Sequence, residues 1–442
     1  MATKAKNLGG TRGRFWALSW PAMLSGVSVP LLGLVDTSIV GRLSQPEALG
    51  AVALGSWLFD MLYWSFGFLR MGTTGLVAQA RGADDQASLR PLLARPLIIG
   101  VIAGLGVVGL GLLGAERALS ILSGGESASL ADTAKIYVHA RLLGGPAVLM
   151  NYACLGWILG MGRVKLALLT QLSLNSVNAA LSVWWGSRWG VEGVAYASAT
   201  AQWLTLLGWG SWIWFRLCPP LSSSALRSSL RDARAWGELA TLNLRLWVRT
   251  CLLLGCFGGL NAMSARLGAL TLSANALLLH LQSLQAFVLD GFAHGAEVLV
   301  GERLGSGDRV GYRDALRVGA EWTFGASLLI AGGYALGAPL ILRALTHHMD
   351  VITQADRYMI WAVVSPVISA PCFLLDGVMI GATESAAMQR GMMISALVFA
   401  LGLITLTPLL GNHGLWLALM LFMSSRAITL TPRAISLGGA QP

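Results

Sequence analysis

Gly156-Trp-Ile-Leu-Gly160 and Gly377-Val-Met-Ile-Gly381 repeat one pattern in the two halves of the chain. The second stretch begins 221 positions after the first, which is half of the 442 residues. A proline precedes each stretch, Pro146 in the first half and Pro366 in the second. Because glycine and proline are frequent in membrane helices, one such match alone is weak evidence for a repeat.

Two further matches fall at nearly the same offset. Gly190-Val-Glu-Gly193 is followed 221 positions later by Gly411-Asn-His-Gly414. Arg81-Gly-Ala-Asp84 resembles Arg303-Leu-Gly-Ser-Gly-Asp308, with a small insertion. A shared offset at three places predicts two repeated halves, joined by a segment rich in Pro, Ser and Arg near the midpoint. The predicted domains are an N-lobe at 1–216, a cytoplasmic linker at 217–234 and a C-lobe at 235–442.

The composition places these halves in a membrane. The chain is 55% hydrophobic and 12% charged, with a mean hydropathy of +0.65, whereas a soluble domain is about 25% charged. A spanning helix needs about 20 mainly apolar residues. We therefore predict an all-α polytopic membrane protein with two pseudo-symmetric lobes of six helices. The twelve predicted spans are 15–40, 48–78, 92–115, 131–159, 165–186, 191–215, 235–264, 269–299, 315–342, 352–381, 391–410 and 413–432.

The positive charges orient the spans. One set of alternate loops, with the two termini, carries most of the Lys and Arg residues, and Arg426 is counted among them. The opposite loops hold only Arg42, Arg117, Arg188, Arg266 and Arg343. The positive-inside rule then predicts a multi-pass protein of the cytoplasmic (inner) membrane with both termini in the cytoplasm. The net charge of +10 is explained as a topology signal, so we expect no nucleic-acid partner.

The motifs favour secondary transport over an enzyme or an ATP-driven pump. The chain has no Gly-x-x-x-x-Gly-Lys-Ser/Thr loop and no Gly-Lys dipeptide. Its five cysteines are scattered, and the adjacent His347 and His348 fit a solvated loop better than a metal site. An intramembrane enzyme would need a nucleophile–base pair, which is not visible. We expect no catalytic residue, cofactor or metal, and a substrate path between two parallel six-span repeats.

Carboxylates inside apolar segments are candidate functional groups, because burying a charge in a membrane is costly. Asp36 in the first span is the sharpest candidate, since burial favours its protonation near neutral pH and Pro30 can bend its helix. We predict that Asp36 carries protons; the alternative is a carboxylate that only pairs with a basic side chain. Asp60 in the second span is a further intramembrane carboxylate, for which Arg70 is a candidate structural counter-ion.

Two further groups of polar residues are candidates. Asn175 and Asn178 share a face of the fifth span and could donate to Asp36, or they could be polar contacts between helices. Asp290 and Glu297, seven apart on the eighth span, and Asp376 on the tenth could form a second acidic site in the C-lobe. Pairing of these acids with Arg245 or Arg249 is the structural alternative.

Several stretches resemble the MATE (multidrug and toxic compound extrusion) family, in its DinF branch. The resemblance runs over nearly the whole chain, and its motifs are specific as a set. They are Val29-Pro-Leu-Leu-Gly-Leu-Val-Asp-Thr-Ser-Ile-Val-Gly-Arg-Leu43, Leu69-Arg-Met-Gly-Thr-Thr-Gly-Leu-Val-Ala-Gln-Ala80, Leu289-Asp-Gly-Phe-Ala293, Leu375-Asp-Gly-Val-Met-Ile-Gly-Ala-Thr383 and Gly411-Asn-His-Gly-Leu-Trp-Leu-Ala418.

The resemblance implies two lobes around a cleft and export of amphipathic, often cationic compounds against protons or sodium ions. It places Asp36 at the coupling position, with bending near Pro30, and places Asn175 and Asn178 in an N-lobe cation and substrate site. This chain departs from the family pattern at two places. Ser182 stands where many relatives carry an aspartate, which favours protons over sodium, and Asn243-Leu-Arg245 replaces a common Asn-x-Asp.

The function expected from the sequence is therefore a proton-coupled multidrug efflux antiporter that works by alternating access between its lobes. We expect a monomer in the lipid bilayer with small amphipathic molecules as substrates. Two alternatives stay open: a flippase for a lipid-linked precursor, which needs a cationic cleft for phosphates, and export coupled to sodium rather than protons.

Overall fold

The computed structural model describes residues 10–26, 46–122 and 128–439, and every regular element in them is helical. This confirms the all-α prediction. Within these described residues, eight helices are long and apolar enough to cross a membrane, or nine if one bent pair counts as a single span. The bent pair, Asp132–Leu142 with Gly145–Gly160, turns by 49° and corresponds to the predicted span 131–159.

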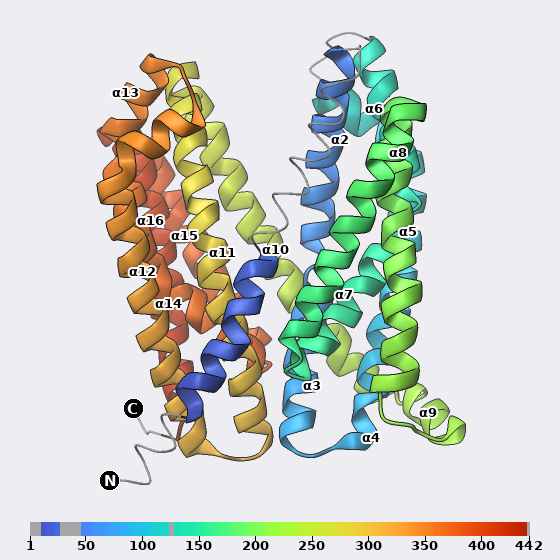
Figure 1. Cartoon of the computed structure of the whole chain (residues 1–442). Helices are drawn as coiled ribbons and strands as arrows, with labels where there is room; N and C mark the ends of the chain where they lie inside the picture. The colour runs from blue at the N-terminus through green and yellow to red at the C-terminus, as the bar shows by residue number, and fades with distance from the viewer. Residues whose placement is uncertain (1–9, 27–45, 123–127, 440–442) are drawn as a thin grey trace. The chain divides into compact units, whose positions relative to one another are not determined.

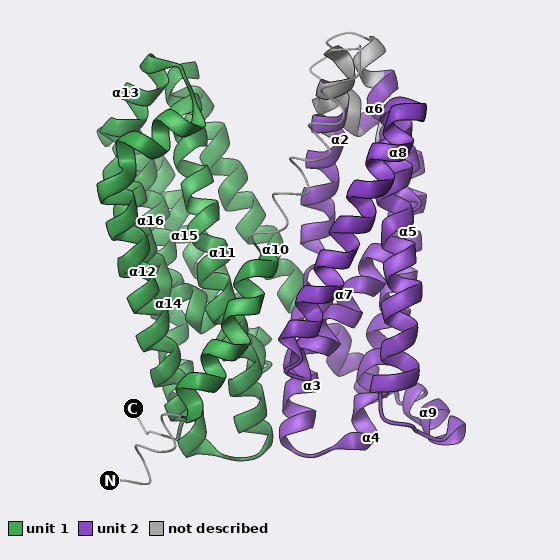
Figure 2. Ribbon diagram, in the orientation of Figure 1, with its two compact units in different colours: residues 1–26, 241–442 green, residues 27–240 purple. Residues whose placement is uncertain are grey.

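Two compact units divide the chain, one formed by Val27–Ala240 and the other by Met1–Gly26 with Thr241–Pro442. We call them the N-terminal unit and the C-terminal unit (Figure 2). The helix of residues 10–26 belongs to the C-terminal unit, although the first predicted span was assigned to the N-lobe at 1–216. The remainder of that span, 27–40, lies outside the described residues.

The N-terminal unit combines long helices with the short helices α4 and α9 (Figure 1). α5 and α3 pack against α7, and α6 packs against α2, α5 and α8. The second predicted span, 48–78, is broken at Phe66–Gly67 between α2 and α3. The helices are α2 (Pro46–Ser65), α3 (Phe68–Gly82), α4 (Gln86–Leu89), α5 (Pro91–Leu122), α6 (Ala128–Leu142), α7 (Gly145–Gly160), α8 (Val164–Thr205), η1 (Leu206–Gly210), η2 (Ile213–Leu217) and α9 (Ser223–Leu230).

The C-terminal unit is built on close packing of α11 with α14 and of α15 with α16. α12 covers both α11 and α14, and α14 also contacts α16. Its helices are α10 (Ala233–Arg266), α11 (Ala269–Gly305), α12 (Arg309–Leu345), α13 (Met349–Arg357), α14 (Met359–Gly381), α15 (Ser385–Leu410) and α16 (Asn412–Leu437).

The helix of residues 10–26 is held on the C-terminal unit by small residues and ion pairs. A side chain at Gly291 or Gly295 of α11 would collide with Met23 or Ser19. Arg12 pairs with Glu321 of α12 at 2.6 Å, and Arg14 pairs with Glu302 of α11. Glycines therefore let this helix approach α11 closely, and ion pairs hold its N-terminal end.

The repeat seen in the sequence reappears in the backbone of the two units. Gly190 has φ 60° and ψ −136°, and its counterpart Gly411 has φ 57° and ψ −134°. These angles are open essentially to glycine alone, so each glycine turns the chain from one span into the next. Gly190 separates the predicted spans 165–186 and 191–215, which run as one bent segment, Val164–Leu217.

The repeat extends to the contacts of the other glycines. Gly156 of α7 lies against Arg70 of α3, and Gly377 of α14 lies in the same way against Ala293 of α11. The loops after α3 and α11 also match, because each ends in an aspartate that caps the next helix. Asp85 accepts a hydrogen bond from the amide of Ser88, and Asp308 accepts one from the amide of Gly311. The quoted glycine stretches are therefore the places where pairs of helices touch backbone to backbone.

The predicted linker, 217–234, contains α9, capped by the Ser222 hydroxyl. Arg95 of α5 donates to the carbonyl oxygen of Ser229 at 2.7 Å and to its hydroxyl at 2.9 Å. The linker is therefore anchored to the N-terminal unit by its own short helix.

Candidate functional site

Asp36 and Pro30, the residues predicted to couple protons to transport, lie outside the described residues. Among the polar groups that the structure does describe, two sets contain residues singled out from the sequence, one inside each unit. The first set lies between α2, α6 and α8 in the N-terminal unit, and the second lies between α10, α14 and α16 in the C-terminal unit.

Asn178 is the buried centre of the first set. Its side-chain amide donates to the Ser198 hydroxyl at 3.0 Å, and its oxygen accepts from the Ser182 hydroxyl at 3.1 Å. Asn175, one turn away and half-buried, accepts instead from Gln171 at 3.1 Å. The two predicted asparagines thus have different partners, and Ser182 is part of the Asn178 network.

Arg141 of α6 extends this network toward α2. Its guanidinium donates to the Tyr137 hydroxyl at 2.7 Å and to the Ser198 hydroxyl at 3.3 Å. Tyr137 also shares a hydrogen bond of 2.9 Å with Ser56 of α2. Since Arg141 lies 5.5 Å from the centre of the Phe59 ring, its charge sits on the buried side of α2. The result is a continuous polar path across three helices that carries one fixed positive charge.

A groove of about 660 Å³ lies between the two arms of the bent segment Val164–Leu217. Its lining is almost wholly apolar and includes Leu166, Leu204 and Trp212. Ser173 accepts a hydrogen bond of 2.8 Å from the Trp209 indole there. With no charged group in its lining, this groove is separate from the polar network.

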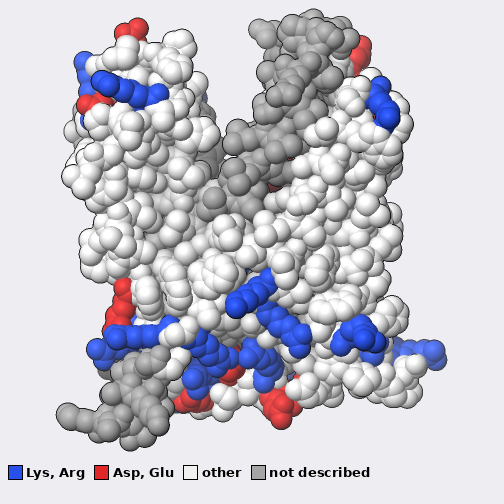
Figure 3. Space-filling model, viewed as in Figure 1, with Lys and Arg blue, Asp and Glu red and all other residues white. Residues whose placement is uncertain are grey.

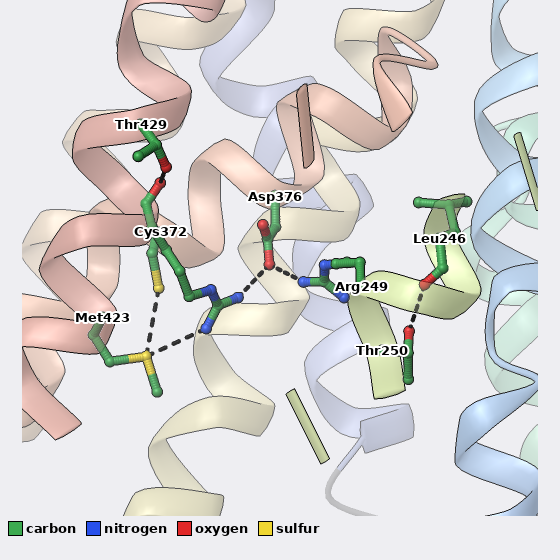
Figure 4. Close-up of polar contacts among 8 residues, drawn as sticks. Leu246, Arg249, Thr250, Cys372, Asp376, Met423 and Thr429 are labelled. Carbon is green, nitrogen blue, oxygen red and sulfur yellow. Dashed lines mark hydrogen bonds and ion pairs between the residues drawn. The ribbon is translucent and has the colours of Figure 1, made fainter. Parts of the chain in front are cut away.

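Asp376 of α14 is the centre of the second set. One of its carboxylate oxygens accepts from both Arg249 of α10 and Arg426 of α16 (Figure 4). The three residues are 8%, 5% and 4% exposed, so the group is buried. Arg426 also contacts the sulfur of Met423 at 3.3 Å and lies 5.5 Å from the centre of the Phe422 ring. The carboxylate is thus enclosed by two guanidinium groups.

The other two acids of the predicted C-lobe site have surroundings of their own. Glu297 is 1% exposed and lies 3.1 Å from Nδ1 of His294, one turn earlier on α11. Asp290 is exposed, and its charge acts on Arg426. Asp290 and Asp376 therefore belong to one electrostatic group with Arg426, whereas Glu297 pairs with a histidine.

Arg249 was expected as a structural partner of these acids and takes that role for Asp376. Arg426, counted above among the cytoplasmic loop charges, is buried in α16 and is a correction to that assignment. The signal for it was present, because Arg426 lies within the predicted span 413–432. An arginine inside a span needs an acidic partner. Asp376, within the predicted span 352–381 of the same lobe, was a candidate for that partner.

Comparison with known proteins places the chain in a family. The MatE family model matches residues 21–184 and 246–406. The DNA damage-inducible protein F of Escherichia coli K12 is 36% identical over 94% of this chain and 90% of its own length. A probable multidrug resistance protein NorM of Xanthomonas campestris is 26% identical over 96% and 95% of the two chains.

Solved structures agree in fold. A crystal structure of MATE in complex with MaL6 has a TM-score of 0.84 at 19% identity, covering 97% of this chain and 98% of the other. A MOP superfamily transporter from Pyrococcus furiosus has a TM-score of 0.81 at 20% identity, covering 98% and 97%. Together with the family match over both units, these likenesses show that the chain is not an enzyme but a polytopic membrane transporter of the MATE family.

Proposed function

We propose that this transporter exports amphipathic, often cationic compounds in exchange for protons, with Asp36 as the proton carrier and Pro30 as the point where its helix bends. The family membership supports export, since several relatives are named as multidrug resistance proteins. The proposed setting is the cytoplasmic membrane, with a monomer whose two termini are cytoplasmic. On the visible face of each unit, taken by itself, most of the Lys and Arg residues lie at one end and fewer at the other, which supports that orientation (Figure 3).

The observation that carries the proposal is the enclosure of Asp376 by Arg249 and Arg426. A coupling acid must gain and lose a proton in the transport cycle. Protonation of Asp376 would leave two buried guanidinium groups without their counter-ion, which is strongly unfavourable. We therefore assign Asp376 a structural role, and the coupling step to the acid of the first span.

The surroundings of Asn178 support protons over sodium ions. Ser182 supplies a hydroxyl, not a carboxylate, and the Asn178 oxygen is already used as its acceptor. Arg141 lies one hydrogen bond further along the same network, through Ser198. A fixed positive charge in this network disfavours a sodium ion bound at Asn178.

The same ion-pair geometry bears on the flippase alternative. A phosphate-bearing lipid precursor needs basic side chains that are free to bind it. Arg249 and Arg426 are buried basic groups of the C-terminal unit, and both bind Asp376. The geometry therefore favours drug export over lipid flipping.

Dye efflux from membrane vesicles tests the proposal. A pH gradient and a sodium gradient are imposed separately on vesicles that hold the wild type, Asp36→Asn or an empty membrane. The proposal expects efflux with the pH gradient alone, and its loss in Asp36→Asn. Efflux that follows sodium, or that persists in Asp36→Asn, would contradict it.

A further inference from the structure

The exposed face of α2 presents a carboxylate between two indoles. Trp57, Asp60 and Trp64 are three and four positions apart, so they lie on one face over about two helical turns. Trp57 is 51% and Trp64 43% exposed, and Asp60 is exposed between them. The adjoining face of the helix is buried through Phe59 and Tyr63.

Asp60 is not neutralised by a direct partner. In the part of the chain that the structure describes, it accepts no hydrogen bond and forms no ion pair. The expected pairing with Arg70 is not formed, and the charges of both residues act instead on Tyr152. Arg141 influences Asp60 only at longer range, because its guanidinium hydrogen-bonds Tyr137 and Ser198 on the buried side of α2.

An unpaired carboxylate cannot face lipid hydrocarbon without a large cost. The exposed face of α2 must therefore border water or a ligand, although two large aromatic side chains lie on it. A negative charge flanked by indole rings is the arrangement that binds organic cations, through charge attraction and cation–π contact. An anionic or purely apolar ligand would use only part of it.

We propose that Trp57, Asp60 and Trp64 form a binding site for the cationic group of an amphipathic substrate, with Asp60 as the counter-ion and the indoles as its aromatic walls. This inference rests on the proposed function, because it names the residues that recognise the exported cations. It is separate from coupling, which is assigned to Asp36. It predicts that the transporter prefers aromatic or quaternary cations over neutral molecules of similar size.

The test is equilibrium binding of radiolabelled tetraphenylphosphonium to the purified full-length protein. Asp60→Asn should raise the Kd at least about tenfold, since it removes the only full charge of the site. Trp57→Ala and Trp64→Ala should each raise it roughly threefold to tenfold, and Trp57→Phe should recover most of that loss. Asp60→Glu should bind nearly as the wild type does.

Matched controls are Asp356→Asn in α13 and Trp189→Ala in α8, exposed residues of the same types on other helices, and they should leave the Kd unchanged. Size-exclusion profiles and helical circular dichroism establish that each variant is folded. A folded Asp60→Asn protein with a Kd within twofold of the wild type would overturn the inference while leaving the proposed function intact. A wild type that neither binds nor exports the cation would overturn both.

Discussion

At Asp376, one carboxylate oxygen accepts hydrogen bonds from two arginines inside the helical core. Removing the acid would leave Arg249 and Arg426 facing each other in a buried site. Because breaking a buried pair costs about 3–5 kcal/mol, Asp376→Asn should lower the thermal unfolding midpoint markedly. The combined variant Arg249→Met, Asp376→Leu, Arg426→Met should be more stable than Asp376→Asn, since it leaves none of these three charges behind.

The matched control for this prediction is Glu384→Gln, which removes the acid of a surface pair with Arg433. Arg433 is 48% exposed there, so the pair is screened by solvent and should be worth at most about 1 kcal/mol. If Asp376→Asn unfolds at the same temperature as Glu384→Gln, then Asp376 does not have the structural role assigned to it.

At the scale of the helical elements, the two glycine turns carry the repeat. Gly193 and Gly414 each pack directly on a backbone carbonyl of the preceding arm, that of Trp185 and that of Leu406. A Cβ at either position would overlap this carbonyl, so Gly193→Ala and Gly414→Ala should each destabilise the fold by about 1–3 kcal/mol. Thermal unfolding in detergent measures the effect.

Gly332 of α12 provides the control, because a Cβ there meets no atom within 4 Å. Gly332→Ala should be neutral or stabilising by up to about 1 kcal/mol, since alanine is the better helix former. Equal destabilisation by all three substitutions would show that the repeated glycines have no special packing role.

The same elements show how far the sequence could predict the fold. The repeated offset predicted the positions of Gly190 and Gly411, because backbone angles that only glycine adopts readily require a glycine at both places. The packing of residues 10–26 on α11 could not be predicted in this way. This packing depends on which helix lies against Gly291 and Gly295 of α11. The hydropathy of the sequence indicates that a helix is apolar, but not which other helix it contacts.

For the candidate sites, the residue types in the sequence indicated which residues to consider, but not which residues they contact. Asp376 stood out as a charge in an apolar span, yet its second partner, Arg426, is counted among the charges of the loops and termini in the sequence analysis. Asn178 was predicted from helical spacing, whereas its contact with Ser198 joins two arms that only the bend at Gly190 brings together.

At the scale of the whole molecule, the charge distribution predicts the orientation in the membrane. The predicted cytoplasmic positions carry most of the Lys and Arg residues, and these include Arg433 near the end of α16. A green fluorescent protein fused after Pro442 should therefore fluoresce, and alkaline phosphatase fused at the same place should be inactive. The reverse pattern would show that the positive charges do not lie inside.

In the proposed cycle, binding of the exported cation releases the proton carried by Asp36, while Asp376 of the C-terminal unit is held by two arginines. The most direct measurement is proton release from purified protein in weak buffer, followed with a pH-indicator dye as tetraphenylphosphonium is added. We predict that the wild type releases protons on binding and that Asp36→Asn binds the cation without releasing any. Undiminished proton release from Asp36→Asn would contradict the account and place the coupling acid elsewhere.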